Sequence, residues 1–330
     1  MEKLKIGLFG IGHNHAQGHM EAFRLHPDLF EIVGYSENSE YWLKKRGGLA
    51  CYDGIARLGE DELIDKCDAL LVETEVPYLM AAARKCIDRG KHIHLDKPAG
   101  EDFAEYEGIL RDAQKKGLVV HLGYLYRTNP AVKKVFEIAE SGALGKILYV
   151  ETAMSAPRSR EYLQYLETFK GGTMYIFGGH IIDFVLRLMG EPKKVEPILF
   201  RSGAEGFNGI DNATALFYYD SGVSVIRTSA IETGGHFRRE LTVVGEKGTV
   251  CISPFERPTT KWLALQNGQE DAYDKLADTT TLELPTNYDR YDAFPAEFYD
   301  RLCGKMSPIY DYGYEISLHK LLLQSCGILG

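Results

Sequence analysis

The first 123 residues alternate between short apolar runs and segments with helical periodicity. Five of the runs have the composition of buried strands: KLKIGLF (3–9), FEIVGYS (30–36), DALLVET (68–74), KHIHLD (91–96) and LVVHLGY (118–124). Strands that alternate with helices in this way form parallel sheets with helices on both faces. Residues 1–123 are therefore predicted to form an α/β domain with a doubly wound parallel sheet.

The order of elements changes after residue 123. A helix (130–142), a strand (146–155) and a long helix near 173–189 come first. Further strands are predicted at 194–203, 212–220, 224–233, 238–246 and 248–254, followed by helices near 289–303 and 312–325. Glycine turns inside YYDSGVSV and VGEKGTVCI indicate hairpins. Residues 124–330 are therefore predicted to form an α+β domain with a large, mostly antiparallel sheet.

Composition excludes several classes of partner. The net charge of −9 argues against a nucleic-acid-binding surface. No stretch approaches the ~20 apolar residues of a membrane helix, and the glycine-broken N-terminal run does not resemble a signal peptide. The six cysteines (Cys51, Cys67, Cys86, Cys251, Cys303 and Cys326) form no C-x-x-C pair. This spacing argues against a disulfide framework or a zinc knuckle, and we expect a cytoplasmic protein.

The loop after the first strand, GIGHNHAQGHM (10–20), suggests a nucleotide site. Gly10 and Gly12 lie between a strand and a helix, where the first glycine permits a tight turn and the second lets the backbone approach a pyrophosphate. The helix N-terminus would bind that phosphate through its free N–H groups and its dipole. His15 replaces the last glycine of G-x-G-x-x-G, so the motif is incomplete.

The same loop raises the alternative of a metal site. His13, His15 and His19 have suitable spacings, but no carboxylate of the segment completes a ligand set, although Glu21 is nearby. A glycine turn without any ligand is a further alternative. We expect a Rossmann dinucleotide site and no metal. The residues expected to contact the cofactor here are Gly10, Ile11, Gly12, His13 and Asn14.

The residue that binds the adenosine ribose should stand at the end of the second strand, about 20 residues beyond the loop. Ser36 and Glu37 occupy that position. A carboxylate accepts hydrogen bonds from ribose hydroxyls and repels a 2′-phosphate, so NAD is favoured over NADP. The alternative is that Glu37 is a solvated turn residue.

Asp96-Lys97-Pro98 follows the fourth predicted strand. Ligands of doubly wound sheets bind at the carboxyl ends of the strands, which would place Lys97 at the nicotinamide. Its ammonium group can bind a substrate hydroxyl and help to move the hydroxyl proton. Pro98 favours an extended backbone at Lys97 and so limits where the side chain points.

These motifs resemble those of the Gfo/Idh/MocA oxidoreductases. Gly10-Ile11-Gly12 is similar to the G-x-G loop of the family, Asp96-Lys97-Pro98 to its E-K-P, and Arg127-Thr128-Asn129-Pro130 to its R-x-x-P. GGTMYIFGGHIID (171–183) resembles the segment that carries the catalytic histidine, and VVGEKGTV (243–250) a late hairpin. The resemblance covers nearly the whole chain. It implies an enzyme with NAD or NADP as cofactor and a homodimer or homotetramer.

The resemblance also assigns roles. Lys97 and His180 would be catalytic. Independently of the family, Asp183 lies three residues after His180 on the same predicted helix, where it could orient His180. Glu73, Thr74 and Asp96 would contact the cofactor, and Arg127 the substrate. The family's T-P-N segment appears as Thr74-Glu75-Val76, Leu79 stands where a histidine follows it, and Ile176 stands in place of an aspartate. The family's usual proton relay is therefore incomplete.

The predicted helix that carries His180 can also be interpreted without the family. His180, Asp183 and Arg187 lie on one stripe of an otherwise apolar helix, so they would also suit a purely structural polar seam. The preceding stretch, residues 156–172, contains Arg158 and Tyr162, which are candidates for sugar contacts or for a solvated helix face.

The predicted function is NAD(P)-dependent oxidation or reduction of a secondary alcohol in a sugar, cyclitol or glycoside. One alternative is elimination or hydrolysis of a glycoside with tightly bound NAD and no net redox change. The other is a non-catalytic protein that senses NAD or a sugar, because a fold does not fix a function.

Overall fold

The computed structural model describes residues 3–269, 275–285, 287–305 and 310–330. The chain divides into two compact units. The first contains residues 1–124 and 289–316, and the second contains residues 125–288 and 317–330. The predicted division at residue 123 lies close to the first of these boundaries, but the prediction did not include the return of residues 289–316 to the first unit.

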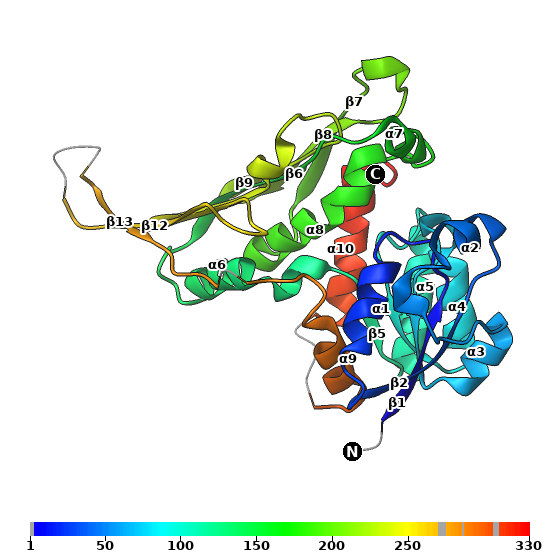
Figure 1. The fold of residues 1–330 in the computed structure, drawn as a ribbon. Helices are drawn as coiled ribbons and strands as arrows, with labels where there is room; N and C mark the ends of the chain where they lie inside the picture. Colours follow the sequence, from blue (N-terminus) through cyan, green and yellow to red (C-terminus); the bar gives the residue numbers. More distant parts are fainter. Residues whose placement is uncertain (1–2, 270–274, 286, 306–309) are drawn as a thin grey trace. The chain divides into compact units, whose positions relative to one another are not determined.

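The first unit is built on a five-stranded parallel sheet with the order β2-β1-β3-β4-β5 (Figure 1). Its strands are β1 (Leu4–Phe9), β2 (Phe30–Ser36), β3 (Ala69–Val72), β4 (His92–Leu95) and β5 (Val120–Leu122). Each strand lies within one of the five predicted apolar runs, which confirms the predicted sheet. The strand order reverses between β1 and β3, the place where open α/β sheets bind ligands.

Helices cover both faces of this sheet (Figure 1). They are α1 (Ala16–Arg24), α2 (Glu40–Arg46), α3 (Glu60–Lys66), α4 (Leu79–Asp88), α5 (Phe103–Lys115) and α9 (Phe294–Leu302). Pro77 lies in the 3₁₀ turn Val76–Tyr78 that leads into α4, and Gly90, with φ +72°, follows its C-cap Arg89. Helix α4 therefore follows a proline turn and ends before a left-handed glycine, as helices often do.

Helix α9 belongs to the core of the first unit although it is about 170 residues beyond β5 in sequence. Phe298 and Tyr299 join the apolar cluster around α1 and β2, where their rings contact Phe23 and Phe30. The cluster explains why this segment returns, because an isolated apolar helix face must be buried somewhere.

The second unit is built on an eight-stranded sheet with the order β13-β12-β11-β10-β6-β9-β8-β7 (Figure 1). Its strands are β6 (Ile147–Ser155), β7 (Lys194–Phe200), β8 (Asn212–Tyr219), β9 (Gly222–Ser229), β10 (Glu240–Gly245), β11 (Gly248–Ser253), β12 (Thr260–Gln266) and β13 (Ala277–Thr281). β6 and β9 pair in parallel and the other neighbours pair antiparallel, so the sheet is mostly antiparallel as predicted. β12 and β13 were not predicted.

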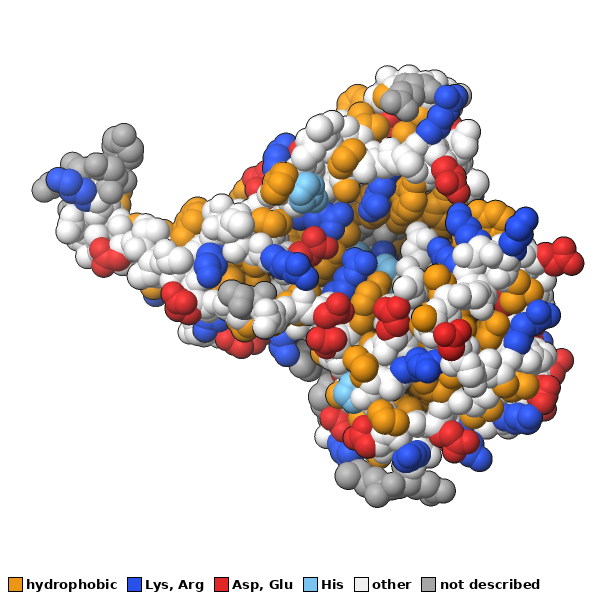
Figure 2. Space-filling model, viewed as in Figure 1, with side chains coloured by type: hydrophobic (Ala, Val, Ile, Leu, Met, Phe, Trp, Pro, Cys, Tyr) orange, Lys and Arg blue, Asp and Glu red, His pale blue; other side chains and the backbone are white. Residues whose placement is uncertain are grey.

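The helices of the second unit are α6 (Pro130–Glu140), α7 (Arg160–Leu166) and α8 (Gly172–Met189), and α10 (Tyr312–Ser325) spans the boundary between the units in sequence. α8 packs on β6, β8 and β9. Alternate residues of β8 are buried and half-exposed, so the sheet has one covered and one more open face. No helix among the described residues is long and apolar enough to cross a membrane. Basic and acidic side chains are interspersed on the face drawn in Figure 2.

Candidate functional site

The loop after β1 requires glycine at its first position. Gly10 has φ +84°, and a Cβ there would lie 2.7 Å from Thr74 Cα. The backbone N–H of Ile11 donates to Glu37 Oε2 at 2.9 Å, which ties the loop to the end of β2. The loop therefore has the tight turn expected of a dinucleotide site.

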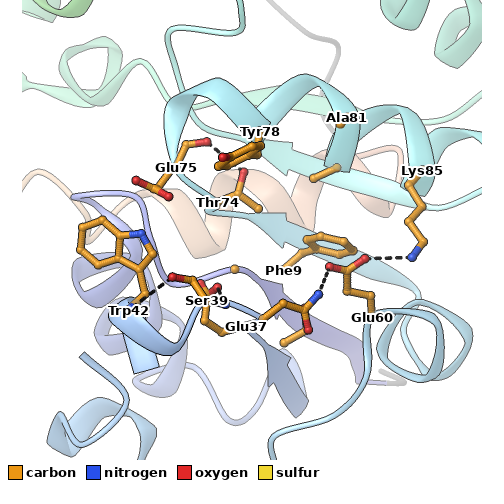
Figure 3. A pocket seen from close by; sticks show the side chains of 14 residues that line it. Phe9, Glu37, Ser39, Trp42, Glu60, Thr74, Glu75, Tyr78, Ala81 and Lys85 are labelled. Carbon is orange, nitrogen blue, oxygen red and sulfur yellow. Dashed lines mark hydrogen bonds and ion pairs between the residues drawn. The ribbon is translucent and has the colours of Figure 1, made fainter. Parts of the chain in front are cut away.

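The backbone at Gly12 is less open than a dinucleotide loop leads one to expect, because two side chains lie close to it. A Cβ at Gly12 would lie 2.8 Å from Glu75 Cγ and 3.1 Å from Trp42 Nε1. Figure 3 shows Trp42 and Glu75 on the same side of the neighbouring pocket. An acidic side chain thus stands beside the backbone that a pyrophosphate would approach.

Arg46, at the end of α2, also holds the loop. Its Nη1 donates to the carbonyl of Ile11 at 2.9 Å and to that of His13, and its Nη2 donates to Asn14 Oδ1 at 2.9 Å. Its guanidinium stacks 4.3 Å from the Trp42 ring centroid. Sequence reasoning missed Arg46 because these loop partners are more than 30 residues away and no local pattern links them.

A pocket of about 530 Å³ opens between the ends of β1 and β2 and helix α4 (Figure 3). Ser36, Glu37 and Thr74, all predicted cofactor contacts, line it. Glu37 also accepts a hydrogen bond from the Ser39 N–H at 2.8 Å, so its carboxylate is fixed at the pocket wall. Lys85 lines the same pocket and has its Nζ 2.9 Å from Glu60 Oε2.

A buried cluster of histidines and carboxylates lies at the carboxyl ends of β3 and β4. Asp96 Oδ2 is 2.8 Å from His15 Nδ1, 3.1 Å from His13 Nδ1 and 3.8 Å from His19 Nδ1. Glu73 is also in the cluster, with Oε1 2.5 Å from His19 Nδ1 and Oε2 3.3 Å from His13 Nδ1. Glu73 and Asp96 are fully buried. The prediction that His13, Glu73 and Asp96 contact a cofactor remains untested, and the structure places all three together.

Two further histidines, His94 of β4 and His121 of β5, extend the cluster. His94 Nε2 lies 3.7 Å from Glu73 Oε1, and His94 Nδ1 lies 3.1 Å from His121 Nδ1. Aromatic rings from the segment that contains α9 enclose these histidines. The centroids of Tyr291 and Phe294 are 5.1 Å and 5.4 Å from that of His19. Neither His94 nor the aromatic cover was identified from the sequence.

Burial and charge set the protonation of this cluster. Burial lowers the pKa of an imidazole, but the carboxylates of Asp96 and Glu73 outweigh it at His13 and raise its pKa to about 9. Burial dominates at His15 and lowers its pKa to about 3. Burial would raise the pKa of the Asp96 carboxyl, but His13 and His15 hold it well below its usual range. Asp96 is therefore ionised and His15 neutral at neutral pH.

Lys97 follows the cluster directly. It is buried, its backbone N–H donates to Asp96 Oδ1 at 2.7 Å, and its peptide bond to Pro98 is cis. The two oxygens of Asp96 thus contact different groups, since Oδ1 holds the Lys97 backbone and Oδ2 faces the histidines. A shift of Asp96 would move Lys97 with it.

In the second unit, Arg127 and Asp183 form a buried bidentate ion pair. Arg127 Nε and Nη2 donate to the two carboxylate oxygens of Asp183, each at 2.9 Å. His180, one turn before Asp183 on α8, packs edge-on against Tyr126 with ring centroids 4.9 Å apart. The sequence predicted that Asp183 orients His180 and that Arg127 contacts a substrate, and the pairing of Asp183 with Arg127 was not predicted.

Arg158 and Tyr162 also lie together. The Arg158 guanidinium is 4.7 Å from the ring centroids of both Tyr162 and Phe177. The two rings are parallel, 6.4 Å apart, so the guanidinium lies between them. Residues 160–166 form helix α7. Ile176 and Leu79, two of the departures from the family pattern, are buried.

Comparison with known proteins identifies the family. Residues 4–124 match the sequence profile of the oxidoreductase family with an NAD-binding Rossmann fold, Gfo/Idh/MocA, and residues 132–251 match the Gfo/Idh/MocA C-terminal domain. The chain belongs to the Gfo/Idh/MocA oxidoreductases. This result confirms the resemblance inferred from the motifs, and a nicotinamide-binding oxidoreductase fold with it.

Several relatives have named activities. The chain is 24% identical over 252 residues to dTDP-3,4-didehydro-2,6-dideoxy-alpha-D-glucose 3-reductase of Streptomyces violaceoruber, covering 76% of this chain and 72% of the relative. It is 26% identical over 278 residues to myo-inositol 2-dehydrogenase of Thermotoga maritima, covering 80% and 79%.

Solved structures agree with the fold. UDP-N-acetylglucosamine 3-dehydrogenase GnnA from Acidithiobacillus ferrooxidans superposes with a TM-score of 0.81 at 18% identity, over 100% of this chain and 98% of that one. The WlbA dehydrogenase from Bordetella pertussis, solved with NADH and UDP-GlcNAcA, gives a TM-score of 0.79 at 18% identity, over 99% and 96%. The predicted fold class is confirmed.

Proposed function

We propose that this protein is an NAD-dependent dehydrogenase or reductase that acts on a secondary alcohol of a sugar, cyclitol or glycoside. The observation that carries the proposal is the pocket at the switch point of the parallel sheet, with Gly10 on one side and Glu37 on its wall. The named relatives, which include a sugar-nucleotide reductase and an inositol dehydrogenase, support the substrate class.

Glu37 supports NAD rather than NADP. Its carboxylate is held by the N–H groups of Ile11 and Ser39, so it cannot swing away to admit a 2′-phosphate without breaking both bonds. The nearby cation Lys85 is already within ion-pair distance of Glu60 and Asp61. Ribose hydroxyls can donate to Glu37, whereas a phosphate would face an uncompensated carboxylate.

Side chains of the protein would bind the substrate, transfer the proton and hold the catalytic segment in place. Bound NAD supplies the hydride chemistry. The Lys97 ammonium would bind the substrate oxygen and stabilise its negative charge as the hydroxyl proton leaves, and His180 would accept or return that proton. Arg158 and Tyr162 would contact ring hydroxyls of the substrate. The Arg127–Asp183 pair would hold the segment around His180 in place. Ile176 carries no acid or base group, so His180 would act without a carboxylate at that position.

The test is a titration of the purified protein with NADH and NADPH. We expect NADH to bind at least about tenfold more tightly, equivalent to about 1.4 kcal/mol. Glu37→Ser should remove most of this preference, while Glu31→Gln, an exposed change on β2, should leave it intact. Equal affinity for both cofactors in the wild-type protein would contradict the assignment of NAD.

A panel of polyols, sugars and glycosides then tests the reaction. Formation of NADH with a polyol or sugar supports the proposed dehydrogenase. Cleavage of a glycoside without net NADH would instead indicate the redox-neutral reaction, and binding of NADH without turnover on any member would indicate a sensor.

A further inference from the structure

Six buried or nearly buried side chains converge below the dinucleotide loop with donor atoms of the kind that bind transition metals. The Nδ1 atoms of His13, His15 and His19 all lie within 3.8 Å of Asp96 Oδ2. The Glu73 carboxylate contacts two of the same nitrogens at 2.5 and 3.3 Å. Ligand atoms around a tetrahedral zinc ion, with bonds of about 2.0–2.2 Å, are separated by about 3.3–3.6 Å. The donor atoms of His19, Glu73, His94 and Asp96 all lie within 4.8 Å of one another, and those of His13, His15 and Asp96 form a second such set.

The tertiary structure supplies the carboxylate ligands that are missing from the sequence around the three histidines. No carboxylate near the three histidines in sequence completes a ligand set. The fold supplies Glu73 from the end of β3 and Asp96 from the end of β4, because parallel strands end at one edge of the sheet. Two histidines of the helix face this edge: His15 at the start of α1 and His19 one turn further.

Unsatisfied polar atoms point to a ligand at the same place. Among the described residues, His19 Nε2 and His94 Nε2 make no hydrogen bond, although both side chains are fully buried. Buried polar groups are normally paired with protein, water or an ion. His94 Nε2 lies 3.7 Å from Glu73 Oε1, so a cation bound there would also place positive charge beside the buried carboxylates.

The chemistry of the donors selects the class of metal. Imidazole nitrogens suit zinc and the neighbouring transition metals, whereas calcium and magnesium prefer sites made entirely of oxygen. We propose that His19, His94, Glu73 and Asp96 bind one divalent transition-metal ion, preferably zinc. The ion would lie next to the backbone of the dinucleotide loop. It would also fix Asp96, whose other oxygen holds the backbone of Lys97.

The test uses the full-length protein without an affinity tag, dialysed against a chelator. Titration with ZnCl₂ should give one bound Zn²⁺ per chain by calorimetry, and Zn²⁺ should raise the melting temperature. Cobalt(II), used as a spectroscopic probe, should give visible ligand-field absorption of a nitrogen- and oxygen-bound ion. His19→Ala and His94→Ala should each weaken Zn²⁺ binding at least about 100-fold.

Two controls separate metal binding from folding. His26→Ala, just beyond the end of helix α1, should bind Zn²⁺ as the wild type does. His19 and His94 are fully buried, so circular dichroism tests the fold of both variants, and their spectra should match that of the wild type. The melting temperatures of His19→Ala and His94→Ala should no longer respond to Zn²⁺.

The proposal is overturned if the chelator-treated protein binds none of Zn²⁺, Co²⁺, Mn²⁺ or Fe²⁺. It is also overturned if His19→Ala and His94→Ala bind Zn²⁺ with wild-type affinity. The metal site does not depend on the proposed function, so NADH is titrated into the same sample. Binding of NADH without metal removes only this proposal, and binding of metal without NADH removes only the proposed function.

Discussion

Glu75 is the residue that fits a dinucleotide site least well. Its side chain approaches Gly12, at the point where the backbone would meet a pyrophosphate. The family pattern has a proline at this position, which carries no charge. We therefore expect the acidic side chain to lower the affinity for a dinucleotide through electrostatic repulsion.

Replacing Glu75 with glutamine removes this charge at nearly constant volume. We expect Glu75→Gln to bind NADH about three- to tenfold more tightly at low salt, and the gain should shrink as salt screens the charges. Fluorescence titration of NADH measures the change. Asp28→Asn, an exposed change two residues before β2, is the matched control and should not change the affinity for NADH.

A substitution of Lys97 tests whether this residue binds the reacting oxygen of the substrate. Lys97→Ala should lower turnover at least about 100-fold, the usual contribution of a positioned proton-transfer group, while NADH affinity stays within about tenfold. Steady-state kinetics and cofactor titration on the same preparation give both values. Wild-type turnover in the variant would show that the reacting oxygen binds elsewhere.

At the scale of elements, helix α1 and the segment before α9 fit together through a glycine. A Cβ at Gly18 would lie 2.4 Å from the ring of Tyr291. Tyr291 in turn packs against His15 and His19, so the fit of these two segments shapes the histidine cluster.

Two glycine-to-alanine changes in helices should therefore have opposite signs. Gly18→Ala should lower the melting temperature because Tyr291 must move. Gly108→Ala in α5, where the nearest atom is the end of the flexible Arg84 side chain at 3.4 Å, should stabilise the protein by about 0.5–1 kcal/mol. Thermal unfolding measures both variants, and equal effects would show that the ring of Tyr291 does not press on Gly18.

The Arg127–Asp183 pair links the entry of the second unit to α8. Asp183→Asn leaves the buried Arg127 opposite a neutral group, so it should destabilise the protein by about 3 kcal/mol. The exposed ion pair of Lys193 and Asp220 provides the control, because Asp220→Asn should cost less than about 1 kcal/mol. An Asp183→Asn variant with unchanged stability but lost turnover would assign Asp183 to the chemistry instead.

At the scale of the whole molecule, the open face of the eight-stranded sheet is the basis for predicting the oligomeric state. Leu216 of β8 and Val225 of β9 are register partners on this face, both half-exposed, and Glu151 of β6 is the next partner in the row. Apolar side chains in the middle of a broad sheet face favour burial against another subunit. We therefore predict a homodimer or homotetramer that uses this face.

Val225→Lys tests the predicted assembly. The new ammonium can pair with Glu151 in the free subunit, so the variant should fold yet shift to a monomer by size-exclusion chromatography with light scattering. Thr279→Lys, on the exposed strand β13, should keep the wild-type mass. A monomeric wild-type protein would contradict the prediction directly.

The amino-acid sequence alone determined the parallel sheet, most of the antiparallel one and the position of the dinucleotide loop. These features depend on local periodicity, turn glycines and the order of elements, which are written along the chain. It also singled out His13, His15 and His19, but it could not supply their partners. Glu73, Asp96 and His94 join them only because parallel strands distant in sequence end at one edge.

Tertiary structure alone decided the rest. Helix α9 lies in the first unit because its apolar face fits α1 and β2 there, a fit between surfaces that no pattern in its own residues encodes. The same holds for Arg46 on the loop carbonyls and for Arg127 on Asp183, whose partners are 32 or more residues away. Periodicity shows which face of an element is buried, whereas the packed chain decides what that face is buried against.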